Sequence, residues 1–349
     1  MAIYIDIKKK LEDFSIELRL ESGSGRIGIL GASGCGKSMT LKMLAGIETP
    51  KEGRIRIGDR VLFDSVKGIN VRPQRRRVGY LFQNYALFPT MTVEQNIAAG
   101  LRGRKEENQR RVREMVERFG LTGLEKRMPH ELSGGQQQRT ALARIMAYEP
   151  EVLLLDEPYG ALDLLLRERL QQELLEMLRG YEGTVIMVSH DRDEIYRFSD
   201  ELLVMERGRT AVFGKCGEIF DNPVKLEAAR LTGCENISKA KLLSPYQLEA
   251  VDFGIVLHTD RRIPKDTAYV GLHAHELVPV WGEGQKNCMK VQEKSITELH
   301  LERHYHLRPE HGTGESVCWS VHRDKWTELD ERGMPDYLMF PEERLLFLK

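Results

Sequence analysis

Short apolar runs alternate with amphipathic stretches along the first two thirds of the chain. The runs are Arg26–Leu30, Val78–Phe82, Val152–Leu155 and Thr184–Val188. Continuous apolar runs of this length are typical of strands that are buried on both faces, as in a parallel sheet covered by helices. We therefore predict a buried strand at each run.

The stretches between these runs have the spacing of helices. Lys37–Ala45 is mostly apolar, and Leu164–Arg179 carries leucines at i, i+4 and i+8 with Gly180 as a C-cap. Ser133 is placed to cap a helix that continues to about Tyr148. Strands that alternate with helices predict an α/β fold with a mainly parallel sheet.

The character of the sequence changes after about Asn236. Ala250–Leu257 and Ala268–Leu272 are predicted as short strands, with turn-forming residues around Asp260–Arg262. No long amphipathic helix is evident in this part of the sequence. We predict an α/β domain over residues 1–233, followed by a small β-rich domain over residues 236–349.

Composition narrows the class of protein. The chain has 349 residues, 41% hydrophobic and 30% charged, with a net charge of −1. This is an ordinary globular composition without the net basic charge of a nucleic-acid-binding protein, so no nucleic-acid partner is expected. No apolar run is long enough to span a bilayer, and the N-terminus alternates like a strand rather than a signal peptide. Five widely spaced cysteines favour a reducing compartment, so we expect the cytoplasm.

The strongest chemical signal is a glycine-rich turn between the first buried strand and the first helix. It matches G-x-x-x-x-G-K-[ST], the phosphate-binding loop of P-loop proteins. The backbone N–H groups of such a loop and the helix N-terminus bind phosphate, while Lys37 reaches the β- and γ-phosphates of ATP and Ser38 binds Mg²⁺. The predicted binding residues are Gly31, Ala32, Ser33, Gly34, Cys35, Gly36, Lys37, Ser38 and Met39.

Two carboxylates end the buried strand Val152–Leu155. Asp156 and Glu157 follow it directly, at the edge of an open α/β sheet where ligands bind. We expect Asp156 to help hold Mg²⁺ and Glu157 to act as the general base that activates the attacking water.

Further motifs carry a family resemblance. Leu132–Gln136 reads LSGGQ, Gln83 follows Leu81-Phe82, Ala161–Asp163 follows the two carboxylates, and His190 lies in Val188–Asp191. In this order the motifs resemble the signature set of ABC ATPases over residues 1–233. The implied fold is a P-loop ABC nucleotide-binding domain with a helical insert at about residues 86–145.

The resemblance also implies a mechanism. In the family, two chains pair head to tail, and the signature of one chain closes over the Mg-ATP of the other. The implied homodimer contacts ATP through Ser133, Gly134, Gly135 and Gln136. Gln83 senses the γ-phosphate through Mg²⁺, His190 contacts the γ-phosphate, and Asp163 links the two sites. The catalytic set is then Glu157, His190, Gln83 and Lys37, with Mg²⁺ held by Ser38, Gln83 and Asp156.

The sequence leaves two contacts open. The segment that in the family stacks on adenine contains Phe14, which either stacks on the base or packs in the core. Apolar residues in the insert either dock to a membrane permease or pack internally; they are Tyr85, Leu87, Phe88 and Met91.

The flanking segments resemble one branch of the family. Val61–Ser65 and Arg75–Gln83 resemble the ATPases of oxyanion importers, and Tyr269–Leu277 resembles their appended OB-like (TOBE-type) domain, although His273 stands where the family usually has Arg. The resemblance implies an ATPase that powers oxyanion import, molybdate first and sulfate or another small solute as the alternative. It acts with permease subunits and a solute-binding protein, at the cytoplasmic face of the membrane. The remote alternatives are a soluble ABC ATPase that is not a transporter, and a binding module without turnover. The appended domain contains five candidate cations. They either bind the oxyanion or are solvated surface groups: Arg261, Arg262, Lys265, His273 and His275.

Overall fold

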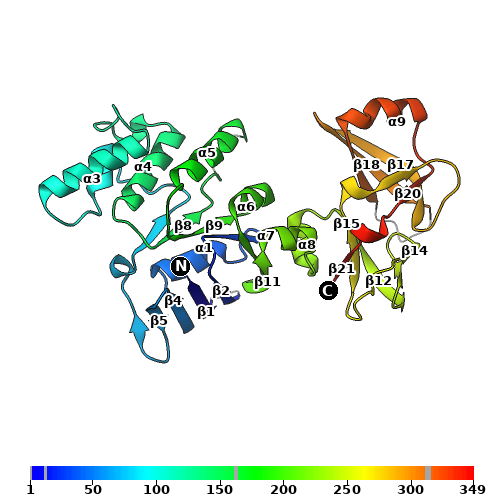
Figure 1. Ribbon diagram of the computed structural model, residues 1–349, viewed down its shortest axis with the longest axis horizontal. Coiled ribbons are helices and arrows are strands. Elements are labelled where there is room, and N and C mark those ends of the chain that lie inside the picture. Colours follow the sequence, from blue (N-terminus) through cyan, green and yellow to red (C-terminus); the bar gives the residue numbers. More distant parts are fainter. Residues whose placement is uncertain (1, 12–13, 161–163, 311–315) are drawn as a thin grey trace. The chain divides into compact units, whose positions relative to one another are not determined.

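The computed structural model describes residues 2–11, 14–160, 164–310 and 316–349. The chain forms two compact units, Met1–Gly217 (unit 1) and Glu218–Lys349 (unit 2) (Figure 1). Helix α8 (Leu226–Thr232) belongs to unit 2, where its Ala229 packs in a buried cluster with Leu346 and Leu348. The domain ranges expected from the sequence, 1–233 and 236–349, stay predictions.

Unit 1 is built on an eleven-stranded sheet with the order β6-β5-β4-β1-β2-β11-β10-β3-β9-β8-β7. The pairs β10–β3, β3–β9, β9–β8 and β8–β7 are parallel, as the alternating pattern predicted. The other end of the sheet is antiparallel, from β6 through β2. The strands are β1 (Ile3–Lys10), β2 (Ser15–Ser22), β3 (Arg26–Gly31), β4 (Glu52–Ile57), β5 (Arg60–Asp64), β6 (Ile69–Asn70), β7 (Val78–Leu81), β8 (Val152–Asp156), β9 (Thr184–Ser189), β10 (Glu201–Glu206) and β11 (Arg209–Lys215).

The helices of unit 1 connect these strands. The helices predicted after the phosphate loop and after Ser133 are confirmed as α1 and α4. In the insert, α2, α3 and α4 contact one another, and Figure 1 shows α3 and α4 on one side of the sheet. The helices are α1 (Lys37–Ala45), α2 (Val93–Ala98), α3 (Lys105–Arg118), α4 (Gly134–Met146), α5 (Leu164–Met177), α6 (Arg192–Phe198) and, across the unit boundary, α7 (Cys216–Asp221).

The core of unit 1 lies between α1 and the sheet. All residues of β8 and β9 are buried, which confirms the prediction of strands covered on both faces. Leu41 and Leu44 of α1 pack with Ile5, Leu18 and Leu154 in one cluster. Each such side chain contributes about 1.5–3 kcal/mol by leaving water. Because this packing holds β3, β8 and β9 in parallel register, the loops after them emerge at one edge of the sheet.

Unit 2 is β-rich, as predicted, with two five-stranded sheets ordered β14-β13-β12-β15-β21 and β16-β20-β17-β18-β19. This architecture agrees with an OB-like appended domain. Its strands are β12 (Asn236–Ser244), β13 (Gln247–Ala250), β14 (Ile255–His258), β15 (Tyr269–Leu272), β16 (Val278–Val280), β17 (Cys288–Glu298), β18 (Glu302–Pro309), β19 (Val317–His322), β20 (Tyr337–Met339) and β21 (Leu346–Leu348), and its second helix is α9 (Trp326–Arg332).

One predicted strand of unit 2 is wrong. Ala250–Leu257 is not a single strand, because β13 ends at Ala250 and β14 begins at Ile255. A turn joins them, with Gly254 at φ 66° and Phe253 buried in the core. Phe253 makes the segment resemble a single apolar strand. Its side chain packs in the core of unit 2 from the turn between the two strands.

Candidate functional site

The phosphate-loop motif lies between β3 and α1, as predicted. Gly34 and Gly36 have φ values of 79° and 104°, a region that side chains rarely adopt. Lys37 is 5% exposed, and its Nζ donates to the carbonyls of Gly31 at 2.7 Å and Ala32 at 3.0 Å. The loop therefore wraps around its own ammonium group at the N-terminus of α1, which is the arrangement of an anion site.

Asp156 joins this loop to the end of β8. Ser38 Oγ donates to Asp156 Oδ1 at 2.7 Å, and the Tyr80 hydroxyl donates to Asp156 Oδ2 at 2.7 Å. Burial, together with the Asp156 carboxylate, raises the pKa of Tyr80 far above its usual value, so Tyr80 remains a donor. Ser38 and Asp156 thus present adjacent oxygen donors, the ligand type that Mg²⁺ requires. The sequence pattern assigned no role to Tyr80, although it lies in β7, three residues before Gln83.

Glu157, His190 and Gln83 meet beside that pair. His190 Nδ1 lies 3.3 Å from Glu157 Oε2, with the side chains 51% and 21% exposed. A Cβ on Gly160 would lie 3.2 Å from Gln83 Nε2 and 3.4 Å from Glu157 Oε2, so both side chains converge on this glycine. Glu157 has φ 45° and its N–H donates to Val188 O at 3.0 Å. A non-glycine residue in the left-handed region stores strain, which is frequent at functional positions.

The turn that carries His190 is held by groups that the sequence pattern did not reveal. Ser189 Oγ donates to Glu194 Oε2 at 2.6 Å and accepts from the Asp191 N–H at 2.9 Å. Arg167 of α5 pairs with Asp191 at 3.2 Å. Glu194 is 5% exposed, and burial raises its pKa. These contacts orient the turn, and only their proximity to the His190 motif could have signalled them.

The signature turn is placed separately. Ser133 caps α4: its Oγ accepts from the Gln136 N–H, and the Gln136 side chain accepts from the Ser133 N–H. Gly135 is buried, and a Cβ added there would lie 3.1 Å from the Leu170 side chain. Among the described residues, no hydrogen bond or ion pair joins Ser133–Gln136 to the phosphate loop of the same chain. Gly134 begins the helix, and Asp163 lies outside the described residues.

Phe14 lies at the edge of the core, and its stacking on adenine stays a prediction. It packs against the core of unit 1 and also lines a cavity of about 460 Å³ with Leu11 and Ile16. Ile16 borders the phosphate loop, since a Cβ on Gly36 would lie 3.1 Å from it.

The apolar residues of the insert divide into two groups. Tyr85 is buried, whereas Phe88 and Met91 are 46% and 36% exposed and Leu87 is half-buried. Arg144 lies over the Phe88 ring, with its guanidinium carbon 5.2 Å from the ring centroid.

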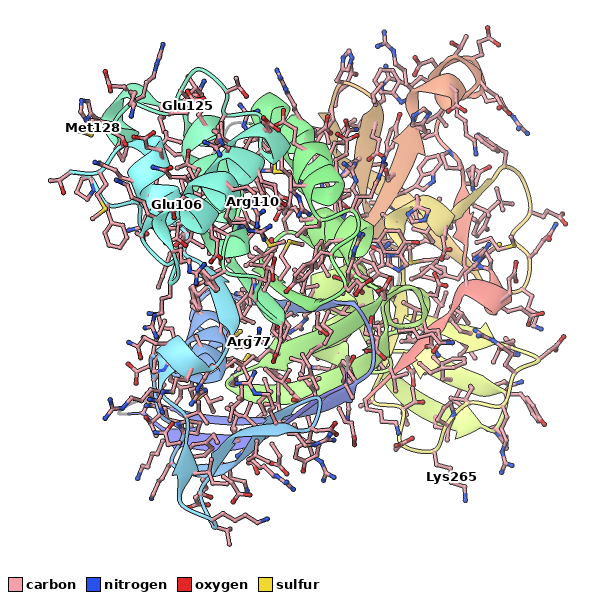
Figure 2. The ribbon with its side chains drawn as sticks, turned by 60° about the vertical axis from the view of Figure 1, so that its left-hand side comes forward. Arg77, Glu106, Arg110, Glu125, Met128 and Lys265 are labelled. Atoms are coloured by element: carbon pink, nitrogen blue, oxygen red, sulfur yellow. The ribbon has the colours of Figure 1, made fainter. Side chains whose placement is uncertain are left out.

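A cavity of about 920 Å³ lies between the sheet and the insert. Arg77 and Val78 line it from the sheet side, and Glu107 and Arg111 of α3 and Tyr148 line it from the helical side. Figure 2 shows Arg77 on the sheet side, and Glu106 and Arg110 on α3 above it. Within the described residues, no helix is both long and apolar enough to cross a bilayer.

Of the cations suggested in unit 2, His273 and His275 stack on each other, with ring centroids 5.6 Å apart. Arg261 donates to the carbonyls of Glu342 and Leu345 and stacks on Phe347, so it holds the fold together. The His273 ring contacts Gly233 O at 3.1 Å. Arg262 and Lys265 are exposed, and His275 lines a separate cavity within unit 2.

Comparisons with known proteins agree with this geometry. The family model described as ABC transporter matches residues 14–160. The sulfate/thiosulfate import ATP-binding protein of Thermosynechococcus vestitus is 36% identical over 308 residues, covering 82% of this chain and 88% of the relative. The trehalose/maltose import ATP-binding protein of Thermococcus litoralis is 45% identical over 221 residues, 62% of this chain.

The chain spans only 59% of the length of the Thermococcus litoralis relative. It spans 55% of a spermidine/putrescine import ATP-binding protein of Acidothermus cellulolyticus. Among solved structures, a dimeric ATP-binding cassette in a post-hydrolysis state, bound to ADP and Pi, matches with a TM-score of 0.52 and 29% identity. That match covers 62% of this chain and 99% of the cassette.

Proposed function

Since this chain belongs to the family of ATP-binding subunits of ABC transporters, we propose that it hydrolyses ATP to power solute import through a separate membrane permease. The observation that carries the proposal is the convergence of Glu157, His190 and Gln83 beside the Ser38–Asp156 pair. A phosphate loop alone supports nucleotide binding, whereas a carboxylate and an imidazole at the same edge of the sheet support turnover.

The geometry suggests a role for each group. Lys37 and the loop amides bind the phosphates, and Ser38, Asp156 and Gln83 would hold Mg²⁺. The metal would supply charge neutralisation on the phosphates. Glu157 accepts the proton of the attacking water, and His190, 3.3 Å from its carboxylate, orients Glu157 and contacts the γ-phosphate. Pre-organised positioning of this kind is the main source of catalysis in phosphoryl transfer.

The proposal includes a head-to-tail homodimer. The signature turn Ser133–Gln136 presents a helix N-terminus, a ready anion site, yet makes no polar contact with the phosphate loop of its own chain among the described residues. A second chain would bring that turn onto the bound nucleotide, and Asp163 would link the two sites. The dimeric cassette among the solved structures supports this arrangement.

The insert is the proposed docking surface for the permease. Phe88 and Met91 expose apolar area, and the cavity beside α3 is large enough to receive a segment of a partner. Docking there would place the chain at the cytoplasmic face of the membrane as a peripheral subunit. A solute-binding protein would then act through the permease.

We infer that the solute is a tetrahedral oxyanion. The sulfate/thiosulfate relative matches over 82% of this chain, more than unit 1 contains, so its similarity extends into unit 2. The relative named for trehalose/maltose matches 62% of this chain, about the length of unit 1, and the relatives named for spermidine/putrescine match 61% to 74%. Sulfate or thiosulfate is supported by that relative, whereas molybdate rests on the sequence segments alone.

Replacement of the general base tests the catalytic proposal. Glu157→Gln should lower ATP turnover by roughly 10²–10⁴-fold, because the amide cannot take the proton. ATP binding should survive, and trapped ATP should hold two chains together in size-exclusion chromatography. Glu182→Gln, at an exposed position, is the matched control and should leave turnover unchanged.

Two results would contradict the proposal. If Glu157→Gln turns over ATP within a few-fold of the native rate, Glu157 is not the general base. If the chain stays monomeric with trapped ATP, the nucleotide is not bound in a composite site between two chains. The solute is tested separately, by comparing ATPase stimulation by sulfate, thiosulfate and molybdate in the complex with its co-purified permease and binding protein.

A further inference from the structure

A cavity of about 370 Å³ lies within unit 2 and is lined only by residues of that unit. Its floor is apolar. Leu277, Trp319, Val321 and Leu329 line it and are each 6% exposed or less. They belong to the main core of unit 2, so the floor is rigid rather than a gap between loops.

One wall of the cavity is a stacked pair of side chains. The Arg332 guanidinium lies 4.0 Å from the centroid of the Trp281 ring. The Trp281 indole N–H donates to Gly333 O at 3.0 Å, which holds the ring in place. A stacked guanidinium keeps its N–H edges available for a ligand, so this wall combines an aromatic surface with a positive charge.

The remaining polar lining is mostly basic. Lys325 and Arg332 are charged and face one lining carboxylate, Glu328, which lies 3.5 Å from Arg332. His275 and His322 add two imidazoles, and His322 Nδ1 lies 2.8 Å from Asp324 Oδ1. Lys325 and Arg332 thus outnumber the one lining carboxylate, before either histidine is protonated.

We propose that this cavity binds a small organic anion. The apolar part of the ligand packs on Trp319 and Val321, and its carboxylate or comparable acidic group meets Lys325 and Arg332. A bare tetrahedral oxyanion is strongly hydrated and gains nothing from the apolar floor. A neutral apolar molecule would leave the basic rim without a partner. The volume is at the lower end of ligand pockets, which favours a ligand about the size of a single ring with a short acidic side chain.

Tryptophan fluorescence gives a direct assay on the full chain. All three tryptophans of the sequence, Trp281, Trp319 and Trp326, lie in unit 2, and two of them line the cavity. We expect phenylacetate to change the emission saturably at millimolar concentration or below. Phenylacetamide, which has the same shape without the charge, should bind roughly ten- to a hundredfold more weakly, because it loses a charge-assisted hydrogen bond. Sulfate and molybdate should neither change the emission saturably nor compete.

A charge reversal tests the rim. Lys325→Glu should weaken phenylacetate binding at least about tenfold and leave phenylacetamide unchanged. The matched control is Lys265→Glu, an exposed lysine outside the cavity lining (Figure 2), which should change neither. The absence of saturable phenylacetate binding, equal affinity for acid and amide, or equal effects of the two substitutions would each overturn the proposal. Unchanged phenylacetamide binding by Lys325→Glu confirms that unit 2 of this variant is folded.

Discussion

Replacement of Arg76 is a sharp test of what holds the phosphate-loop helix in place. Arg76 is fully buried, although it precedes β7 in a segment rich in exposed arginines. Its Nη1 donates to Met43 O and Leu44 O of α1, both at 2.8 Å, and its Nε donates to Val71 O at 2.8 Å. Its Nη2 donates to Asn70 Oδ1 at 3.0 Å. A cation at a helix C-terminus also complements the helix dipole.

The magnitude follows from these contacts. Four hydrogen bonds from a charged donor are worth about 1.5–3 kcal/mol each, or at least about 6 kcal/mol together. Burial lowers the pKa of Arg76 from its usual value to about 10, which corresponds to roughly 3 kcal/mol of desolvation cost. Arg76→Met removes both contributions, and single substitutions rarely exceed about 5 kcal/mol. We therefore expect the free energy of unfolding to fall by about 3–5 kcal/mol.

Urea unfolding followed by far-UV circular dichroism measures this loss, because most helical residues lie in unit 1. Arg75→Met is the matched control: Arg75 is exposed, so its loss should stay within about 0.5 kcal/mol. Arg76→Lys keeps the charge without the planar fork and should fall between the two. A loss below about 1 kcal/mol for Arg76→Met would refute the role of Arg76 in holding the end of α1.

Three further predictions concern the nucleotide site. Gly160→Ala should lower ATP turnover several-fold without loss of fold, since its Cβ would crowd Gln83 and Glu157, and a turnover equal to the native value would contradict their convergence. Maleimide should abolish turnover through Cys35, with protection by Mg-ATP and resistance in Cys35→Ser. Cys35 is itself buried, but it lies in the phosphate loop at the N-terminus of α1, a position that favours the reactive thiolate. Burial raises the pKa of Cys216, Cys234 and Cys318, so they should label more slowly. Burial raises the pKa of Glu194 above 4.5, so its contribution to stability is present below that pH and is lost as pH rises through the raised pKa. Glu194→Gln should flatten the dependence of unfolding free energy on pH above about 4.5, and an unchanged slope would contradict this.

Local patterns alone determined much of this protein. The glycine-rich turn between β3 and α1, the buried strands β8 and β9, and the Ser133 cap of α4 were all predicted correctly because each depends on contiguous residues. A glycine-rich turn, an apolar run or a capping serine has its physical effect within a few positions of the chain. The positions of Asp156 and Glu157 at the ligand edge of the sheet follow from the same local reasoning.

Only the tertiary structure decided the contacts between distant segments. The burial of Arg76 against α1, the hydrogen bond from Tyr80 to Asp156 and the Ser189–Glu194 support of the His190 turn join residues that no local pattern connects. The same is true of the unit 2 cavity, whose basic rim comes from separate segments. The turn inside Ala250–Leu257 was mispredicted for the same reason. Phe253 packs against core residues that are distant in the sequence, so its apolar character does not indicate a strand. Burial and charge pairing depend on which surfaces meet after folding, and a linear pattern of polar and apolar residues does not specify that.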